Sequence, residues 1–365
     1  MQSDQSTGVK TITEQPQFLF PPFVYDCDRS IHVYGQSKTF MQEKGYWERI
    51  SDLAWAYTDI GDLIPHTSEN LWSGHFFPWT ESWNELQISF DLCLFGLYKQ
   101  AMVSLRCGLE LGLLSVYWNL NDDGHETIQE WFHSQEDTPF RKSIFRKLDQ
   151  HRNFELFQQK YDLKSRLGKL DFLHDYVHTK GGRYSNRFGL PKPNFQTFEE
   201  RGFLTWFGAF EEVIELLAIF HLVKYPIGTI GFNYYEKFGI DTPAFGGLDR
   251  SAVDRLENIV GEEVFEIIGE VALADQTVRN ILEWVSSLPD MTEEQRETQI
   301  IEFEKTDIQQ SGLEEWLEQE KLILESWPTP EEKGKEKYLR RIELLTQWAK
   351  DNGFEKPPWE RQRSK

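Results

Sequence analysis

Apolar residues recur at intervals of three and four positions along most of the chain, the spacing that places them on one face of an α-helix. One such run begins at Ser37 and continues to about Leu63. Another covers residues 203–226 and stops at Pro226, which cannot continue a helix. No segment shows the sustained alternation of Val, Ile and Thr that is typical of a strand. The pattern therefore predicts an all-α fold.

The longest predicted helix lies at the centre of this fold. Ser82 followed by Glu85 has the form of a capping box, and we expect the helix to continue to Asn119, a length of about 55 Å at the standard rise. Small residues three or four positions apart form one stripe of this helix, and they would let a second helix approach closely. They are Ser104, Gly108, Gly112 and Ser115.

Capping residues and prolines predict further boundaries. The predicted helix starts are Thr138-Pro139, Asp162, Thr197 with Glu200, and Thr292 with Gln295. The predicted C-terminal helices are residues 250–286, 292–326 and 331–351. These boundaries divide the chain into an extended arm at 1–35, a helical bundle at 36–226, a linker loop at 227–249, an acidic C-terminal helical region at 250–352 and a tail at 353–365. The arm is assigned because QFLFPPFVYD mixes prolines with aromatic rings and has no helical period.

Composition changes this picture in two respects. The chain has 365 residues, 39% of them hydrophobic and 15% aromatic, so it should fold around a sizeable core despite a net charge of −21. Its three cysteines form no CxxC pair and its N-terminus resembles no secretory signal, so we expect a cytoplasmic protein. We expect no membrane span, because Arg106 and Glu110 interrupt the most apolar run, at residues 101–118.

The charge is unevenly distributed. Residues 141–192 hold 13 Lys/Arg and 5 Asp/Glu, a net charge of +8, whereas residues 251–330 carry a net charge of −15. The basic segment favours an anionic partner such as RNA or a nucleotide, and the acidic helices could bind a protein partner. We also expect the two segments to lie against each other, and an oligomer is possible.

Two constellations could carry chemistry. Arg106 and Glu110 lie four positions apart on one helix face, and they form either a structural ion pair or one wall of a polar pocket. His174 and His178 have the spacing of the zinc-binding H-E-x-x-H helix, but Asp175 replaces its glutamate and Tyr184 stands at the third-ligand position. We therefore expect no metal and no other cofactor. The alternative for the histidines is structural: His174 continues the stripe of Leu163, Leu167 and Leu170 into the core, and His178 interacts with the helix C-terminus.

The segments LRCGLEL, EWFHSQEDTPFRKSIFRKL and LHDYVHTKGG resemble uncharacterised bacterial all-α proteins related to the HEPN-like helical bundles of defence and toxin systems. The resemblance covers about residues 82–185. Nucleases of that group use an arginine five to seven positions before a histidine on one helix. His178 matches the histidine, but Asp171, Phe172 and Leu173 occupy the arginine positions. Arg166 does not have the required spacing, and Arg106 would have to act from the long helix.

The residues and the resemblance together predict a protein that binds an anionic ligand, RNA or a nucleotide, and RNA cleavage is possible. The candidate catalytic residues are His178, His174 and Arg106, and the candidate ligand-binding residues are Lys180, Arg183 and Glu110. The first alternative is a noncatalytic structural or protein-binding helical protein. The second alternative is a metal-dependent hydrolase that uses His174 and His178.

Overall fold

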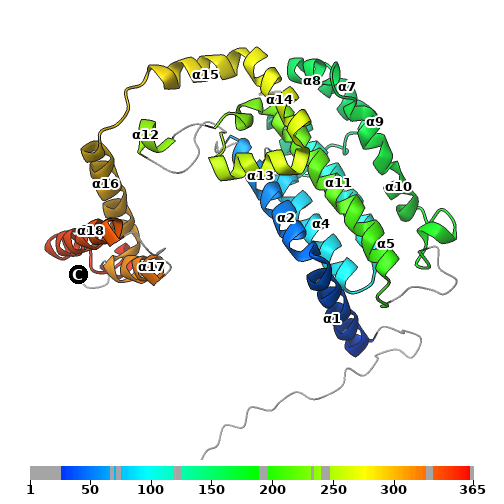
Figure 1. The fold of residues 1–365 in the computed structure, drawn as a ribbon, viewed down its shortest axis with the longest axis horizontal. Coiled ribbons are helices and arrows are strands. Elements are labelled where there is room, and N and C mark those ends of the chain that lie inside the picture. The colour runs from blue at the N-terminus through cyan, green and yellow to red at the C-terminus, as the bar shows by residue number, and fades with distance from the viewer. Residues whose placement is uncertain are drawn as a thin grey trace, which may run out of the picture. The chain divides into compact units, whose positions relative to one another are not determined.

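The structure is a computed structural model. The part of the chain that it describes is built from helices (Figure 1). The described residues are 26–65, 70, 75–118, 120, 125–188, 196–231, 234–239, 247–325 and 332–361. Within these residues there is no strand, so the all-α prediction is confirmed. Residues 1–25 of the predicted arm lie outside the described ranges, and residues 27–35 are helical rather than extended.

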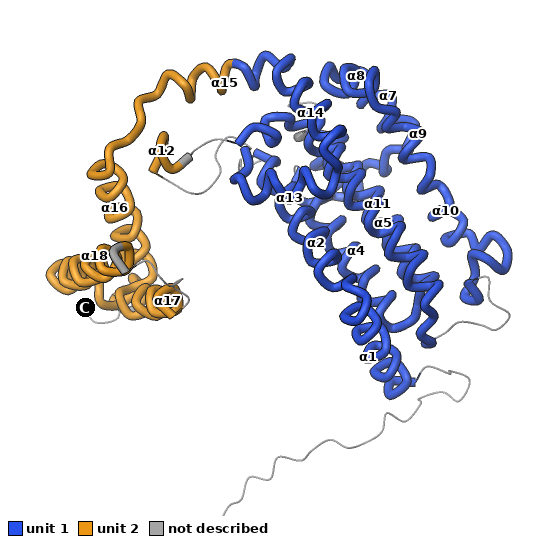
Figure 2. Tube along the Cα trace, in the orientation of Figure 1, with its two compact units in different colours: residues 1–232, 245–279 blue, residues 233–244, 280–365 orange. Residues whose placement is uncertain are grey.

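The chain forms two compact units (Figure 2). Unit 1 consists of residues 1–232 and 245–279, and unit 2 consists of residues 233–244 and 280–365. This division differs from the expected one, because residues 250–279 pack with the N-terminal bundle rather than with the rest of the acidic region. Among the described residues, no helix is long and apolar enough to cross a membrane.

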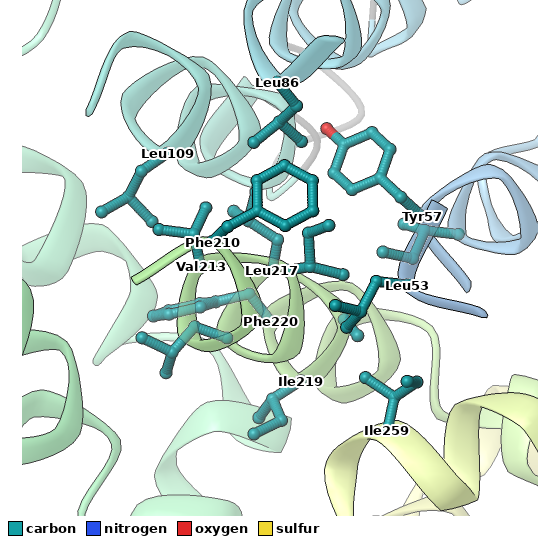
Figure 3. Packing of buried hydrophobic residues seen from close by; sticks show 14 of the residues in the cluster. Leu53, Tyr57, Leu86, Leu109, Phe210, Val213, Leu217, Ile219, Phe220 and Ile259 are labelled. Atoms are coloured by element: carbon teal, nitrogen blue, oxygen red, sulfur yellow. The ribbon is translucent and has the colours of Figure 1, made fainter. Parts of the chain in front are cut away.

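Unit 1 is built around α11 (Glu200–Lys224), whose side chains are buried on nearly all sides. A helix that is apolar all round needs neighbours on every face. Those neighbours include α2 (Tyr46–Leu63), α4 (Phe76–Leu94), α5 (Tyr98–Trp118) and α13 (Arg250–Val260). Figure 3 shows the resulting core, in which Phe210, Leu217 and Phe220 of α11 lie among Leu53, Leu86, Leu109 and Ile259 of these neighbours.

The predicted central helix from Ser82 to Asn119 is wrong, because the chain turns back at Gly96. The φ angle of Gly96 is +69°, and a Cβ there would lie 2.5 Å from the carbonyl oxygen of Thr197, so only glycine fits. The resulting α4 and α5 are antiparallel. The Ser82 hydroxyl donates to the carbonyl of Gly108 at 2.6 Å, and the Ser89 hydroxyl donates to that of Ala101 at 2.7 Å. Ser82 is therefore a buried contact within α4 rather than a cap.

The close approach predicted from the small-residue stripe is confirmed, although two helices make it. The Cα of Gly108 faces Leu86 and the backbone of Ser82 in α4. Gly112 faces Leu217 of α11, and a Cβ at this position would lie 2.6 Å from both methyl carbons of that leucine. The stripe therefore lets α5 fit between α4 and α11.

Most of the remaining helices of unit 1 are shorter than these, although α1 is as long as α2. They are α1 (Cys27–Lys44), α6 (His125–Phe132), α7 (Arg141–Leu148), α8 (Arg152–Gln158), α9 (Leu163–Gly168), α10 (Phe172–Val177) and α14 (Glu262–Ala274). The helices α7 to α10 form a row beside α5 and α11 (Figure 1). Asp162 caps a helix as predicted, by accepting the backbone N–H of Ser165 at 2.9 Å. That helix, α9, was expected to carry both histidines but ends at Gly168, and His174 lies in the separate α10.

Other predicted starts and lengths need correction. The helix expected from Thr138-Pro139 begins at Arg141, and α11 begins after Glu199 without a side-chain cap from Thr197. The predicted helix 250–286 is divided into α13, α14 and α15 (Gln276–Ser287), and 292–326 is divided at Gly312. The loop 226–249 contains a 3₁₀ turn at Pro226–Thr229 and the short α12 (Tyr234–Phe238).

Unit 2 is a small helical assembly with its own core. Its main helices are α16 (Glu293–Ser311), α17 (Leu313–Glu325) and α18 (Glu332–Asp351), followed by α19 (Pro358–Arg361). The capping box of Thr292 and Gln295 is confirmed, with both reciprocal bonds formed. The core consists of Ile308, Leu313, Trp316, Leu345 and Ala349. Beside it, Arg341 of α18 lies 2.9 Å from the carboxylate of the largely buried Glu304.

Candidate functional site

A cleft of about 790 Å³ lies between α5 and the row formed by α7, α9 and α10. Its walls are mainly aliphatic: α5 contributes Leu109, Leu113 and Leu114, while Leu167, Leu170 and Leu173 come from the opposite side. These leucines face inward because each helix turns one apolar stripe toward the bundle. Charged side chains join this apolar interior from both sides: Arg106, Arg141 and Lys180, and the carboxylates Glu110, Asp171 and Asp175 with which they are paired. The imidazole of His174 also lines the cleft. The cleft thus combines apolar walls with three ion pairs and a histidine.

Arg106 and Glu110 form the ion pair that the sequence predicted, and both line the cleft. The Nε and Nη2 of Arg106 donate to Oε1 of Glu110 at 3.0 and 2.7 Å. The Arg106 side chain is 23% exposed and that of Glu110 is 52% exposed, so the carboxylate is well hydrated. The expected alternatives, an ion pair or a pocket wall, are therefore not exclusive, because the pair is one edge of the cleft.

The two histidines are on the surface, so the prediction that His174 continues the leucine stripe into the core is wrong. His174 is exposed and lines the cleft, whereas Leu163, Leu167 and Leu170 are buried. His178 caps the C-terminus of α10, and its backbone N–H donates to the His174 carbonyl at 3.3 Å. The centroids of the two imidazole rings are 4.2 Å apart. The histidines thus form an accessible pair at one end of the cleft.

The turn after α10 places the remaining predicted residues. Thr179 and Gly181 have φ angles of +48° and +78°, which reverse the chain direction. Lys180 lines the cleft and lies 3.3 Å from Asp175. Arg183 does not line the cleft, and its guanidinium lies 5.6 Å from the centroid of the Tyr184 ring. The structure therefore gathers Arg106, Glu110, His174 and Lys180 in one cleft, with His178 beside it and Arg183 on the following turn.

Sequence reasoning missed two lining residues, Phe140 and Arg141. The Phe140 side chain is 83% exposed, although phenylalanine usually avoids water. Arg141 forms an ion pair with Asp171 across the cleft lining. The indole N–H of Trp131 donates to the Thr138 hydroxyl at 3.1 Å, and this bond holds the segment before Phe140. The Thr138-Pro139 signal marked this segment, but nothing in the sequence indicated that its aromatic ring would be exposed.

Half of the described cations of the basic segment are paired with nearby carboxylates. Ion pairs within unit 1 join Lys164 to Asp149, Arg152 to Glu155, Lys160 to Glu270, and Arg166 to both Glu212 and Glu215. The pair of Lys160 with Glu270 of α14 is a contact between the basic segment and the acidic helices, as expected for the part of those helices that belongs to unit 1. Local ion pairs thus reduce the positive charge of the segment without removing it.

The described residues contain no group of three or more His, Cys, Asp and Glu side chains that could hold a metal ion. Asp175, the residue at the position of the zincin glutamate, is paired with Lys180. Tyr184, at the third-ligand position, instead packs on the ring of Tyr176 with a centroid distance of 5.1 Å. Burial raises the pKa of Tyr176 to about 12, so this phenol is neutral and acts as a packing residue.

Comparison with protein-family models, curated proteins and solved structures finds no match to this chain.

Proposed function

We propose that the cleft binds a nucleotide unit, either free or as part of an RNA, in the cytoplasm. The observation that carries the proposal is the combination of apolar walls with four basic side chains in one cleft, Arg106, Arg141, His174 and Lys180. A nucleotide combines the same two features, an aromatic base and an anionic phosphate. RNA is included because residues 82–185 resemble HEPN-like bundles. The cleft volume of about 790 Å³ lies in the range of sites for small organic ligands.

The base would occupy the aliphatic part of the cleft. Phe140 is the exposed aromatic ring of its lining, and it follows Pro139, whose own φ angle is fixed by its ring. Stacking of a base on an aromatic side chain contributes about 1–3 kcal/mol and tolerates every base. Phe140 thus has a function in the complex that explains why so large an apolar ring is left in water. Selection among bases would come from polar contacts, which the leucine walls do not offer.

The phosphate would bind to the basic side chains by exchanging with their carboxylate partners. Arg106, Arg141 and Lys180 are paired with Glu110, Asp171 and Asp175. Exposed ion pairs contribute only about 0–1 kcal/mol, so the exchange costs little. The terminal phosphate of a free nucleotide gains more than the carboxylate did, because it carries nearly two negative charges instead of one. Any phosphate can also bind a guanidinium through two oxygens, whereas Arg106 contacts only Oε1 of Glu110. The paired cations therefore remain competent for an anionic ligand.

RNA cleavage is the second candidate, and the histidine pair favours it. An exposed pair of imidazoles with ring centroids 4.2 Å apart, one of them in the cleft with Arg106, could supply a general acid and a general base. If cleavage occurs, His178→Ala should abolish it while leaving nucleotide affinity within about twofold, because His178 does not line the cleft. His174→Ala should abolish cleavage and also weaken nucleotide binding, because His174 lines the cleft. Intact RNA after prolonged incubation with the unaltered protein would leave binding as the function.

The binding proposal is tested by calorimetric titration with AMP and with ribose 5-phosphate, which lacks the base. We expect AMP to bind and ribose 5-phosphate to bind at least about tenfold more weakly, because it cannot stack on Phe140. The double variant Arg106→Met/Glu110→Leu should fold normally and lose AMP binding. Arg152→Met is the matched control, because this arginine is also ion-paired but does not line the cleft.

Two outcomes would contradict the proposal. AMP binding that is unchanged in Arg106→Met/Glu110→Leu would place the ligand elsewhere. Absence of binding by the unaltered protein to AMP, to UMP and to RNA would instead favour the alternative of a structural or protein-binding helical protein.

A further inference from the structure

The turn after α10 carries cations that extend beyond the cleft. This basic loop comprises residues 178–188 and contains Lys180, Arg183 and Arg187. Lys99, at the start of α5, joins it by donating from Nζ to the Thr179 hydroxyl at 2.7 Å. Among the described residues, no carboxylate lies within ion-pairing distance of Lys99, Arg183 or Arg187. The cations of the cleft, in contrast, are each paired with a carboxylate.

The basic loop is continuous with the cleft and is held against α5. Lys180 belongs to both, since it lies in the loop and lines the cleft. At the other end, the side-chain amide of Gln100 donates to the Asn186 side chain at 3.0 Å, so the loop is tied to the first turn of α5 at two points. Arg106 and Lys99 are separated by seven residues, or about 10 Å along the helix. A line of positive charge therefore leads out of the cleft along α5.

We propose that a single-stranded RNA, with one nucleotide in the cleft, continues over the basic loop toward Lys99. This inference rests on the proposed function and extends it from one nucleotide to a strand. A stacked strand advances about 3.4 Å per nucleotide, so the distance from Arg106 to Lys99 corresponds to about three nucleotides. The strand is single, because a base must leave its stack and its partner to enter an apolar cleft. Arg183 and Arg187 contact phosphates beyond the first.

The charges along this path support an anionic strand. The acidic group in the path is Asp175, which is already paired with Lys180 and has a side chain that is 19% exposed. Arg183 and Arg187 are exposed, and Lys99 is held by a neutral hydroxyl rather than by an acid. A phosphate that approaches these three cations consequently displaces water and counterions but no carboxylate, and counterion release makes such binding strongly dependent on salt.

The test compares AMP with a single-stranded RNA of about eight nucleotides, measured at several salt concentrations. We expect the RNA to bind at least about tenfold more tightly than AMP at low salt. The variant Lys99→Gln/Arg187→Gln should keep the affinity for AMP and lose most of this difference. Its slope of log K against log salt concentration should decrease by about 1.4, which is about 0.7 for each lost phosphate contact on a single strand.

The matched control is Lys142→Gln/Arg146→Gln, which removes two exposed cations of α7 that do not line the cleft. We expect this control to leave both affinity and salt slope nearly unchanged, and a charge-keeping Lys99→Arg/Arg187→Lys variant to retain RNA binding. Equal affinities for AMP and RNA, or equal losses in the control and the test variant, would overturn the path but leave the nucleotide site standing. Failure of AMP to bind would overturn the proposed function itself.

Discussion

Arg166 ties the outer wall of the cleft to the central helix, so its removal should destabilise unit 1 strongly. The guanidinium of this α9 residue binds two carboxylates of α11: Nε lies 2.6 Å from Glu212, and a second ion pair joins it to Glu215. Its Nη1 also donates to the Tyr161 hydroxyl at 2.6 Å. The exposed fractions of the Arg166, Glu212 and Glu215 side chains are only 16, 26 and 17%.

The cost of Arg166→Met follows from the two carboxylates left behind. Loss of one partner from a fully buried ion pair costs about 3–5 kcal/mol, and the residual hydration of these side chains lowers our expectation to about 2–3 kcal/mol. Burial already raises the pKa of Glu215, and Arg166 opposes that effect. Without the arginine this pKa should rise further, so the folded variant binds more protons than the unfolded chain. The loss of stability should therefore be smaller at about pH 5 than at about pH 8.

Urea unfolding followed by circular dichroism measures the effect. The triple variant Arg166→Met/Glu212→Gln/Glu215→Gln should recover most of the lost stability, because it leaves no unpaired buried charge. Arg152→Met is the exposed control, and we expect it to cost at most about 0.5 kcal/mol. The reasoning fails if Arg166→Met costs no more than this control, or if the triple variant is no more stable than the single one.

Three further outcomes are expected. Burial raises the pKa of Glu304 to about 7, so the folded protein keeps this proton over a pH interval in which the unfolded chain has lost it. The stability of unit 2 should therefore decrease as pH rises from about 4.5 to about 7, and urea unfolding of Glu304→Gln should show no such decrease over the same interval. In thermal unfolding, Gly112→Ala should destabilise unit 1 by about 1–3 kcal/mol, because the added methyl group overpacks against Leu217. Gly168→Ala should leave the stability of unit 1 unchanged or raise it, because a Cβ there meets open space. Elemental analysis should find no stoichiometric zinc, and one zinc per chain that is lost in His174→Ala/His178→Ala would refute this expectation.

Local sequence signals predicted the elements whose boundaries depend on neighbouring residues. Asp162 and Thr292 cap helices because a short polar side chain reaches a backbone N–H three residues ahead. The helix ending before Pro226 and the final helix near residues 331–351 followed from proline geometry and apolar period. The same signals failed at Ser82, whose hydroxyl is used by a carbonyl 26 positions away.

In the candidate site, too, some residues could be predicted from the sequence and others depend on tertiary contacts. Sequence reasoning selected Arg106, Glu110, His174 and Lys180 separately, by residue type and helical spacing, and the structure places all four in one cleft. It missed Phe140 and Arg141, because exposure of an aromatic ring and pairing of Arg141 with Asp171, 30 positions away, depend on how distant segments pack.

By itself, the sequence determined the all-α class, several helix ends and the charge of each segment, since periodicity, capping and charge are properties of residues close together in the chain. Only the tertiary structure decided that residues 76–118 fold back as a hairpin at Gly96, and that the histidines face water beside a leucine-walled cleft. Those features arise from contacts between distant residues, such as Gly96 with Thr197 and Gly112 with Leu217. Their energies exceed the local preferences that favour one continuous helix.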